Sequence, residues 1–230
     1  MRKILIQTVP LLCVASLLFA AAACSGLDAL DVVGKEAVSS FGAMLDAAAD
    51  GVAPDEANGG WSLTAPDGAA RFIWSEDYSK SPLHDVMLEL DAQPFIDAGL
   101  DTGKLPEGVI FYGHMLMAGR KLGDDELAYS GDPTPLASFE QLAGKYRAAV
   151  GYHAALGHYN IDLGGGNMFE WAKDMAANDK DIVFVLDPQP FMDAGTDVSA
   201  VEGWAFAKVS VDVDGKPAEV DKLLKPFDLK

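Results

Sequence analysis

Two stretches of this chain are nearly identical: Leu90-Asp91-Ala92-Gln93-Pro94-Phe95-Ile96-Asp97-Ala98-Gly99-Leu100-Asp101 and Leu186-Asp187-Pro188-Gln189-Pro190-Phe191-Met192-Asp193-Ala194-Gly195-Thr196-Asp197. Nine of the twelve positions carry the same residue. Agreement by chance over such a window would be about one residue at average amino-acid usage. The match therefore indicates an internal repeat, which has to be identified before a fold class is inferred.

Each copy of the repeated stretch has the pattern of a corner that follows a strand. The runs Val86–Leu90 and Ile182–Leu186 are short and apolar, as buried strands are. Asp91 and Asp187 then stand where a helix N-cap would, and a glycine follows one short helical turn. Alternatively, the repeated acids form carboxylate cation sites, although their spacing does not supply the oxygen ligands of a calcium loop.

Similar elements precede both corners. Apolar residues recur at helical spacing over 27–50 and again over 136–150. Two alternating segments around a turn, 61–65 and 71–74, predict a hairpin. Composition predicts a loop over 51–60, and the residues after the first corner predict one strand from Val109 to about Leu122.

These elements predict an α+β fold made of two tandem repeats, each with the order helix, strand, strand, strand, short helix, strand. The strands are expected to be predominantly antiparallel, with one long helix per repeat packed on the sheet. The expected segments are a signal peptide (1–23), a lipidated N-terminus with a short tether (24–35), repeat 1 (36–123), a connection (124–133), repeat 2 (134–213) and a C-terminal hairpin or tail that repeat 1 lacks (214–230).

The N-terminus has the features of an export signal. Met1-Arg2-Lys3 is followed by a mainly apolar run, which ends in Ala20-Ala21-Ala22-Ala23-Cys24-Ser25. This segment resembles the signal of bacterial lipoproteins, which implies lipid attachment at Cys24 and removal of residues 1–23. The alternative is ordinary cleavage that leaves a free Cys24. We expect an extracytoplasmic protein held by its N-terminal lipid on the cell surface or the periplasmic face of the membrane.

Composition excludes some partners. The chain has a formal charge of −18, and loss of Arg2 and Lys3 with the signal would leave 15 basic and 35 acidic residues, a formal charge of −20. Nucleic acid is therefore not expected as a partner. Of the two cysteines, Cys13 would leave with the signal and Cys24 would carry lipid, so stability must come from a core rather than from disulfides.

No catalytic motif is present, and enzyme activity is not expected. Gly164-Gly165-Gly166 aligns with a hairpin turn of the first repeat rather than with a phosphate loop. His114 and its neighbouring methionines suggest a soft-metal site, but strand alternation separates them, so no metal or cofactor is predicted. His153 and His158 are expected at a core edge and in a loop.

A ligand site is expected where the repeats differ, because shared positions are explained by a shared fold. The strand 182–186 is apolar on both faces, whereas the strand 86–90 carries Glu89, which would need water or a partner. We place a candidate ligand site at Glu89, Arg71 and His114, with Trp61 and Trp74 as apolar walls. The alternative is an ordinary solvent-facing glutamate.

Three functional classes remain open. The first is a non-enzymatic binding module for a small molecule or peptide, the second a structural or interaction subunit of an envelope complex, and the third an unrecognised enzyme or cation-binding protein. A deep pocket between the repeats would favour the first class and an exposed apolar patch the second. A buried carboxylate or histidine with a strongly shifted pKa would favour the third.

Overall fold

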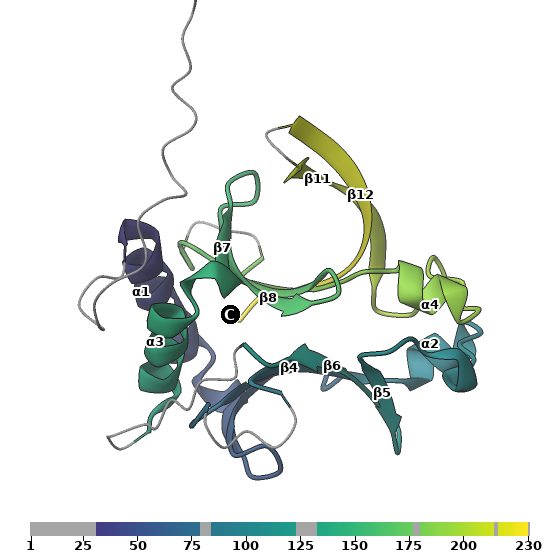
Figure 1. The fold of residues 1–230 in the computed structure, drawn as a ribbon, viewed down its shortest axis with the longest axis horizontal. Helices are drawn as coiled ribbons and strands as arrows, with labels where there is room; N and C mark the ends of the chain where they lie inside the picture. Colours follow the sequence, from purple (N-terminus) through teal and green to yellow (C-terminus); the bar gives the residue numbers. More distant parts are fainter. Residues whose placement is uncertain (1–30, 79–83, 123–132, 177–179, 214–215, 230) are drawn as a thin grey trace, which may run out of the picture.

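The structure, a computed structural model, describes residues 31–78, 84–122, 133–176, 180–213 and 216–229. It is a mixed α+β fold with two six-stranded antiparallel sheets that face each other (Figure 1). Cys24, where lipid attachment is expected, and the expected signal peptide lie outside the described residues.

The two sheets have the same order of strands. The first, in the order β1-β2-β3-β4-β6-β5, contains β1 (Val52–Asp55), β2 (Gly60–Thr64), β3 (Ala70–Ser75), β4 (Val86–Asp91), β5 (Val109–Tyr112) and β6 (Met115–Arg120). The second, in the order β7-β8-β9-β10-β12-β11, contains β7 (Val150–His153), β8 (His158–Gly164), β9 (Asn167–Ala172), β10 (Ile182–Leu186), β11 (Ala205–Val213) and β12 (Lys216–Phe227).

Helices occupy both ends of this pair of sheets (Figure 1). The long helices are α1 (Val32–Ala47) and α3 (Pro135–Lys145), which contact each other. The corners are α2 (Gln93–Asp97) and α4 (Gln189–Asp193), and 3-10 turns follow at η1 (Ala49–Gly51), η2 (Thr102–Lys104) and η3 (Arg147–Ala149).

The register of the strands is also the same in both halves. Leu116 of β6 pairs with Leu90 of β4 and with Phe111 of β5. In the second half, Leu223 of β12 pairs with Leu186 of β10 and with Phe206 of β11. The C-terminal strand β12 therefore has a counterpart in β6, so the expectation that 214–230 adds an element that the first half lacks was wrong. Residues 214 and 215 themselves lie outside the described residues.

Two elements of the first half differ from expectation. The segment 51–60 contains strand β1, which pairs with β2 although it includes Pro54. Proline is tolerated there because β1 is an edge strand of the sheet. The single strand expected over 109–122 is a hairpin instead, since the chain turns at Gly113 and His114 between β5 and β6.

Aromatic side chains from corresponding positions of the two halves meet in the interior, on the long helices, on the sheets and on the corner helices. The ring centroids of Phe41 and Phe139 are 3.7 Å apart, and the rings are stacked. Two further pairs of rings follow: Phe72 stacks on Phe169 with centroids 4.1 Å apart, and the centroids of Phe95 and Phe191 are 4.9 Å apart. One continuous hydrophobic core therefore spans both sheets.

Each long helix is hydrogen-bonded to the sheet of the other half. Trp171 of β9 donates to the hydroxyl of Ser40 on α1 at 2.9 Å. The hydroxyl of Ser138 on α3 donates to the carbonyl oxygen of Ser75 on β3 at 2.8 Å. The halves are thus interlocked rather than stacked side by side, and they form one folded unit.

The repeated corners join the halves at the opposite end. The backbone N–H of Asp101 donates to the carbonyl of Ala194 at 2.9 Å, and the N–H of Asp197 donates to that of Ala98 at 2.8 Å. Gly99 has a φ of 101°, and a Cβ there would lie 3.0 Å from the carbonyl oxygen of Gly195. Glycine is required because the left-handed backbone and the close approach both exclude a side chain.

Candidate functional site

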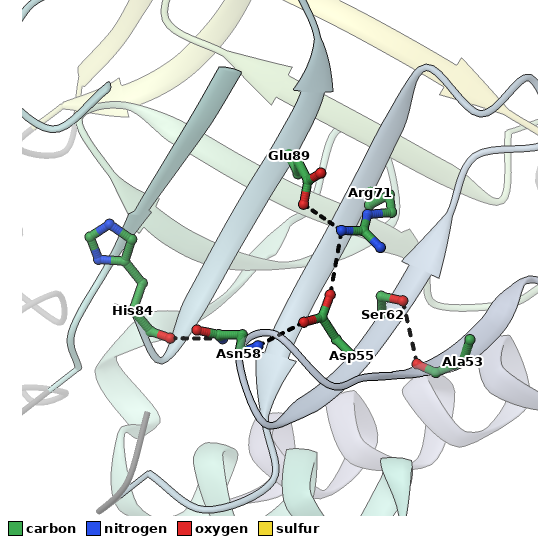
Figure 2. A network of polar contacts seen from close by, with 7 residues as sticks. All are labelled: Ala53, Asp55, Asn58, Ser62, Arg71, His84 and Glu89. Carbon is green, nitrogen blue, oxygen red and sulfur yellow. Dashed lines mark hydrogen bonds and ion pairs between the residues drawn. The ribbon is translucent and has the colours of Figure 1, made fainter. Parts of the chain in front are cut away.

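The structure brings together two of the side chains that the sequence placed in a ligand site. Arg71 on β3 pairs directly with Glu89 on β4, and the guanidinium donates to Glu89 Oε2 (Figure 2). The same guanidinium lies 3.4 Å from Oδ2 of Asp55 on β1, a residue that the sequence did not single out. Arg71 is about one-third exposed, whereas the Asp55 side chain is buried. One guanidinium thus faces two carboxylates on the outer face of the first sheet.

Asp55 also connects this cluster to the hairpin turn between β1 and β2. Its Oδ1 accepts a hydrogen bond from the N–H of Asn58 at 2.9 Å, and the Asn58 amide donates to the carbonyl of His84 at 3.2 Å (Figure 2). Because Asp55 is buried and hydrogen-bonded within the turn, its contact with Arg71 fastens β1 to β3. The hydrogen bonds and the ion pair of Asp55 give this residue a structural role, whereas Arg71 and Glu89 stay partly exposed to solvent.

The other three residues of the expected site lie elsewhere. Trp61 and Trp74 are direct cross-strand partners whose side chains belong to the core, on the face opposite Arg71. Trp74 is fully buried, and its indole N–H donates to the carbonyl of Pro135 at 3.1 Å. His114 is exposed in the turn between β5 and β6. The structure therefore does not gather these three around Glu89.

The second sheet buries a carboxylate that sequence analysis missed. Glu170 on β9 is 2% exposed, and its two oxygens each lie 3.5 Å from the Nδ1 of a histidine, His153 on β7 and His158 on β8. The two histidines are direct cross-strand partners. The register of the β7–β8 hairpin places the two histidines opposite each other, and this register was not predicted from the sequence. Their common contact with Glu170 was therefore not predicted either.

Burial and the histidines act in opposite directions on Glu170. Burial opposes ionisation, but His153 and His158 outweigh it, so the pKa of Glu170 is lowered from its usual value. Nε2 of His158 lies 3.1 Å from the carbonyl of Lys180 and donates to it, since a carbonyl only accepts. A buried carboxylate with a lowered pKa is stabilised as an anion, and its burial leaves little room for a substrate.

An exposed apolar surface lies on the outer face of the first sheet. Tyr112 and Met115 are cross-strand partners, as are Ile110 and Met117, and we call these four residues the β5–β6 surface. Tyr112 is 77% exposed and Ile110 is 40% exposed. Met117 also pairs with Glu89, so the surface continues into the Arg71 cluster. The corresponding positions of the second half carry two alanines, a lysine and a leucine: Ala205, Ala207, Lys222 and Leu224.

A depression of about 310 Å³ lies in the second half between α4 and β12. Its walls combine apolar and charged side chains: Asp187, Pro188, Gln189, Met192, Val220, Asp221 and Lys222. Such a volume is at the lower end of the roughly 300–1,000 Å³ typical of ligand pockets. The depression lies at one corner rather than between the two sheets.

Comparisons with known proteins give no external guide to these sites. No family model matches the chain, and the searches of curated proteins and of solved structures found no match.

Among the described residues, no group of three or more histidine, cysteine, aspartate or glutamate side chains is arranged to hold a metal ion. No helix in that same part of the chain is long and apolar enough to cross a membrane.

Proposed function

We propose that this chain is a lipid-anchored protein of the bacterial cell envelope that acts by docking a second protein on the β5–β6 surface. The observation that carries the proposal is the exposure of the large apolar side chains Ile110 and Tyr112 on the edge strand β5, beside the partly buried methionines of β6. Edge strands with exposed apolar residues are liable to pair with other chains unless a partner covers them.

We also infer that the two halves are tandem repeats, each with its long helix packed on a sheet.

The competing classes have less support. A binding module with a deep pocket between the halves would need space that is occupied here by the stacked phenylalanines. An enzyme would need accessible reactive groups, whereas Glu170 and His158 are both buried. We therefore rank the interaction role first and propose that the protein is not an enzyme.

The surroundings of the β5–β6 surface indicate the chemistry of the partner. Methionine side chains adapt to varied apolar shapes, and tyrosine, methionine and arginine are enriched at protein interfaces. The rim carries Asp55 and Glu89 against the single cation of Arg71, an excess of one negative charge. The proposed partner segment is extended and mainly apolar, with at least one lysine or arginine, and it adds to the free edge of β5.

The proposed anchor leaves this surface accessible to another envelope protein. Helix α1 begins at Val32, at the end of the molecule opposite β5 (Figure 1). A lipid on Cys24 would hold the α1 end toward the bilayer, because eight extended residues span only about 28 Å. The β5–β6 surface would then face away from the membrane.

A photo-reactive phenylalanine analogue at position 112 of the full-length chain tests the proposal. Irradiation in the native envelope is expected to yield one dominant protein adduct whose linked segment is apolar and basic. A synthetic peptide of that segment should bind the purified chain. Its affinity should fall at least tenfold in the Ile110→Ser/Met117→Ser variant, because hot-spot contacts at interface centres dominate binding.

The same analogue at Tyr152 is a matched control, because this tyrosine is also exposed but lies on the edge strand β7 of the other sheet. It should not give the same adduct. Equal labelling from both positions, adducts with lipid alone, or a peptide affinity that ignores the double substitution would each contradict the proposal.

A further inference from the structure

The depression between α4 and β12 is a second candidate site, independent of protein docking. Some of its residues have counterparts in the first half, and others do not. The corner residues of the two halves make the same hydrogen bonds. The N–H of Gln189 donates to Asp187 Oδ1 at 3.0 Å, as the N–H of Gln93 does to Asp91 Oδ1. The wall formed by β12 is different, since β6 begins at Met115 and has no counterpart of Val220 or Asp221.

Lys222 is the distinctive group in this wall. It occupies the position of Met115 in the first half, yet the residue is only 9% exposed. Its ammonium donates one hydrogen bond, 2.7 Å long, to the carbonyl of Gly166. Burying a charge against a neutral carbonyl is costly unless further partners are present. An ammonium has three donors, so the described contacts leave two of them for a ligand.

An acidic acceptor lies close to this ammonium. A Cβ on Gly166 would lie 3.2 Å from both Asp187 Oδ2 and Lys222 Nζ, so the two groups converge on this glycine. Asp187 uses Oδ1 to hold the start of α4, which leaves Oδ2 as an acceptor. The depression thus offers a cation and a carboxylate side by side.

The remaining lining contains two polar residues, Gln189 and Asp221, of which Asp221 pairs with Lys208, and three apolar residues. Pro188, Met192 and Val220 complete the wall, and Met192 is partly exposed beside the two charges. We propose that the depression binds a small zwitterion that joins a carboxylate, an ammonium and an apolar side chain. The carboxylate contacts Lys222, the ammonium contacts Asp187, and the side chain lies on Met192. A free α-amino acid and a dipeptide share this chemistry.

Calorimetric titration of the full chain with L-leucine tests the site. Wild type should bind L-leucine at least tenfold more tightly than L-leucinamide, which lacks the carboxylate, and N-acetyl-L-leucine, which lacks the ammonium. Glycyl-L-leucine and L-leucylglycine distinguish the sources. Tighter binding of either dipeptide identifies the ligand class as a dipeptide, and tighter binding of leucine identifies it as a free amino acid.

Two substitutions assign the contacts. Lys222→Met should weaken leucine binding at least tenfold. Asp187→Asn, which keeps an oxygen acceptor for Gln189, should weaken leucine but leave N-acetyl-L-leucine unchanged. Lys180→Met is the control, since Lys180 is exposed and pairs with Asp228 away from the depression. Absence of leucine binding in wild type, equal affinity for the blocked analogues, or unchanged affinity in both variants would overturn the proposal.

Discussion

At the scale of single residues, the carboxylates on the outer faces of the two sheets have different partners. In the first sheet the guanidinium of Arg71 lies within ion-pair distance of two carboxylates, Asp55 and Glu89. In the second sheet two imidazoles lie beside one carboxylate, Glu170, which is buried more deeply than Glu89. Truncating one member of a buried pair leaves the other charge without compensation, so these clusters should show in stability measurements.

Glu170 gives a prediction for the dependence of stability on pH. Its pKa is lowered on folding, so its contribution to the free energy of unfolding is present above the unfolded pKa of about 4.3 and is lost as the pH falls through the folded pKa. Glu170→Gln should therefore destabilise the protein at pH 7 by about 1–3 kcal/mol. The difference from wild type should shrink toward about pH 3, as measured by urea unfolding at several pH values.

The exposed residue Glu202 is the matched control for this measurement. Glu202→Gln should follow the wild-type pH profile. If the free energies of unfolding of wild type and Glu170→Gln differ by the same amount from about pH 7 to pH 3, the role assigned to the contact of Glu170 with the two histidines is wrong.

At the scale of elements, the repeated corner shows what sequence can and cannot predict. Asp91 and Asp187 were expected as the N-caps of the short helices. Each accepts a hydrogen bond from the N–H of the first helical residue, but the N-cap positions are Ala92 and Pro188, one residue later. Local patterns suffice for such features because the partners are only two residues apart. The reciprocal bonds between the two corners and the contact of Glu170 with two histidines depend on long-range register, which no local pattern contains.

The corner also gives a stability prediction. Gly99→Ala should lower the free energy of unfolding by about 1–3 kcal/mol, because the backbone has φ of 101° and a Cβ would crowd the carbonyl of Gly195. Gly108→Ala is the control, since its φ is 91° but nothing lies within 4 Å of its Cβ. Thermal unfolding should therefore show a larger loss for Gly99→Ala. Equal losses would mean that the contact between the corners adds nothing to the backbone strain.

At the scale of the whole molecule, the interlocked halves determine how functional surfaces are distributed. Each long helix bonds to the sheet of the other half, and phenylalanines fill the interior. A ligand between the sheets would have to displace these side chains, which is why both proposed sites are on the outer surface. Both proposed sites lie where the halves differ, one on β5 and β6 and the other beside β12. The sequence pointed to Glu89 and not to Lys222, because the depth of burial of Lys222 depends on the hairpin of β11 and β12.

The last prediction concerns how the whole molecule is held at the membrane. If Cys24 carries lipid, Cys24→Ala should lose acyl label and move from the membrane to the soluble fraction, because the substitution removes the site of the proposed lipid anchor. Cys13→Ala is the matched control, since Cys13 would leave with the signal, and its variant should remain labelled and membrane-bound. Partner labelling from position 112 should also weaken in Cys24→Ala, since release lowers the effective concentration of the β5–β6 surface near an envelope partner. Native protein that is already soluble and unlabelled would refute the anchor, while binding of the partner peptide to purified protein would still test the docking surface on its own.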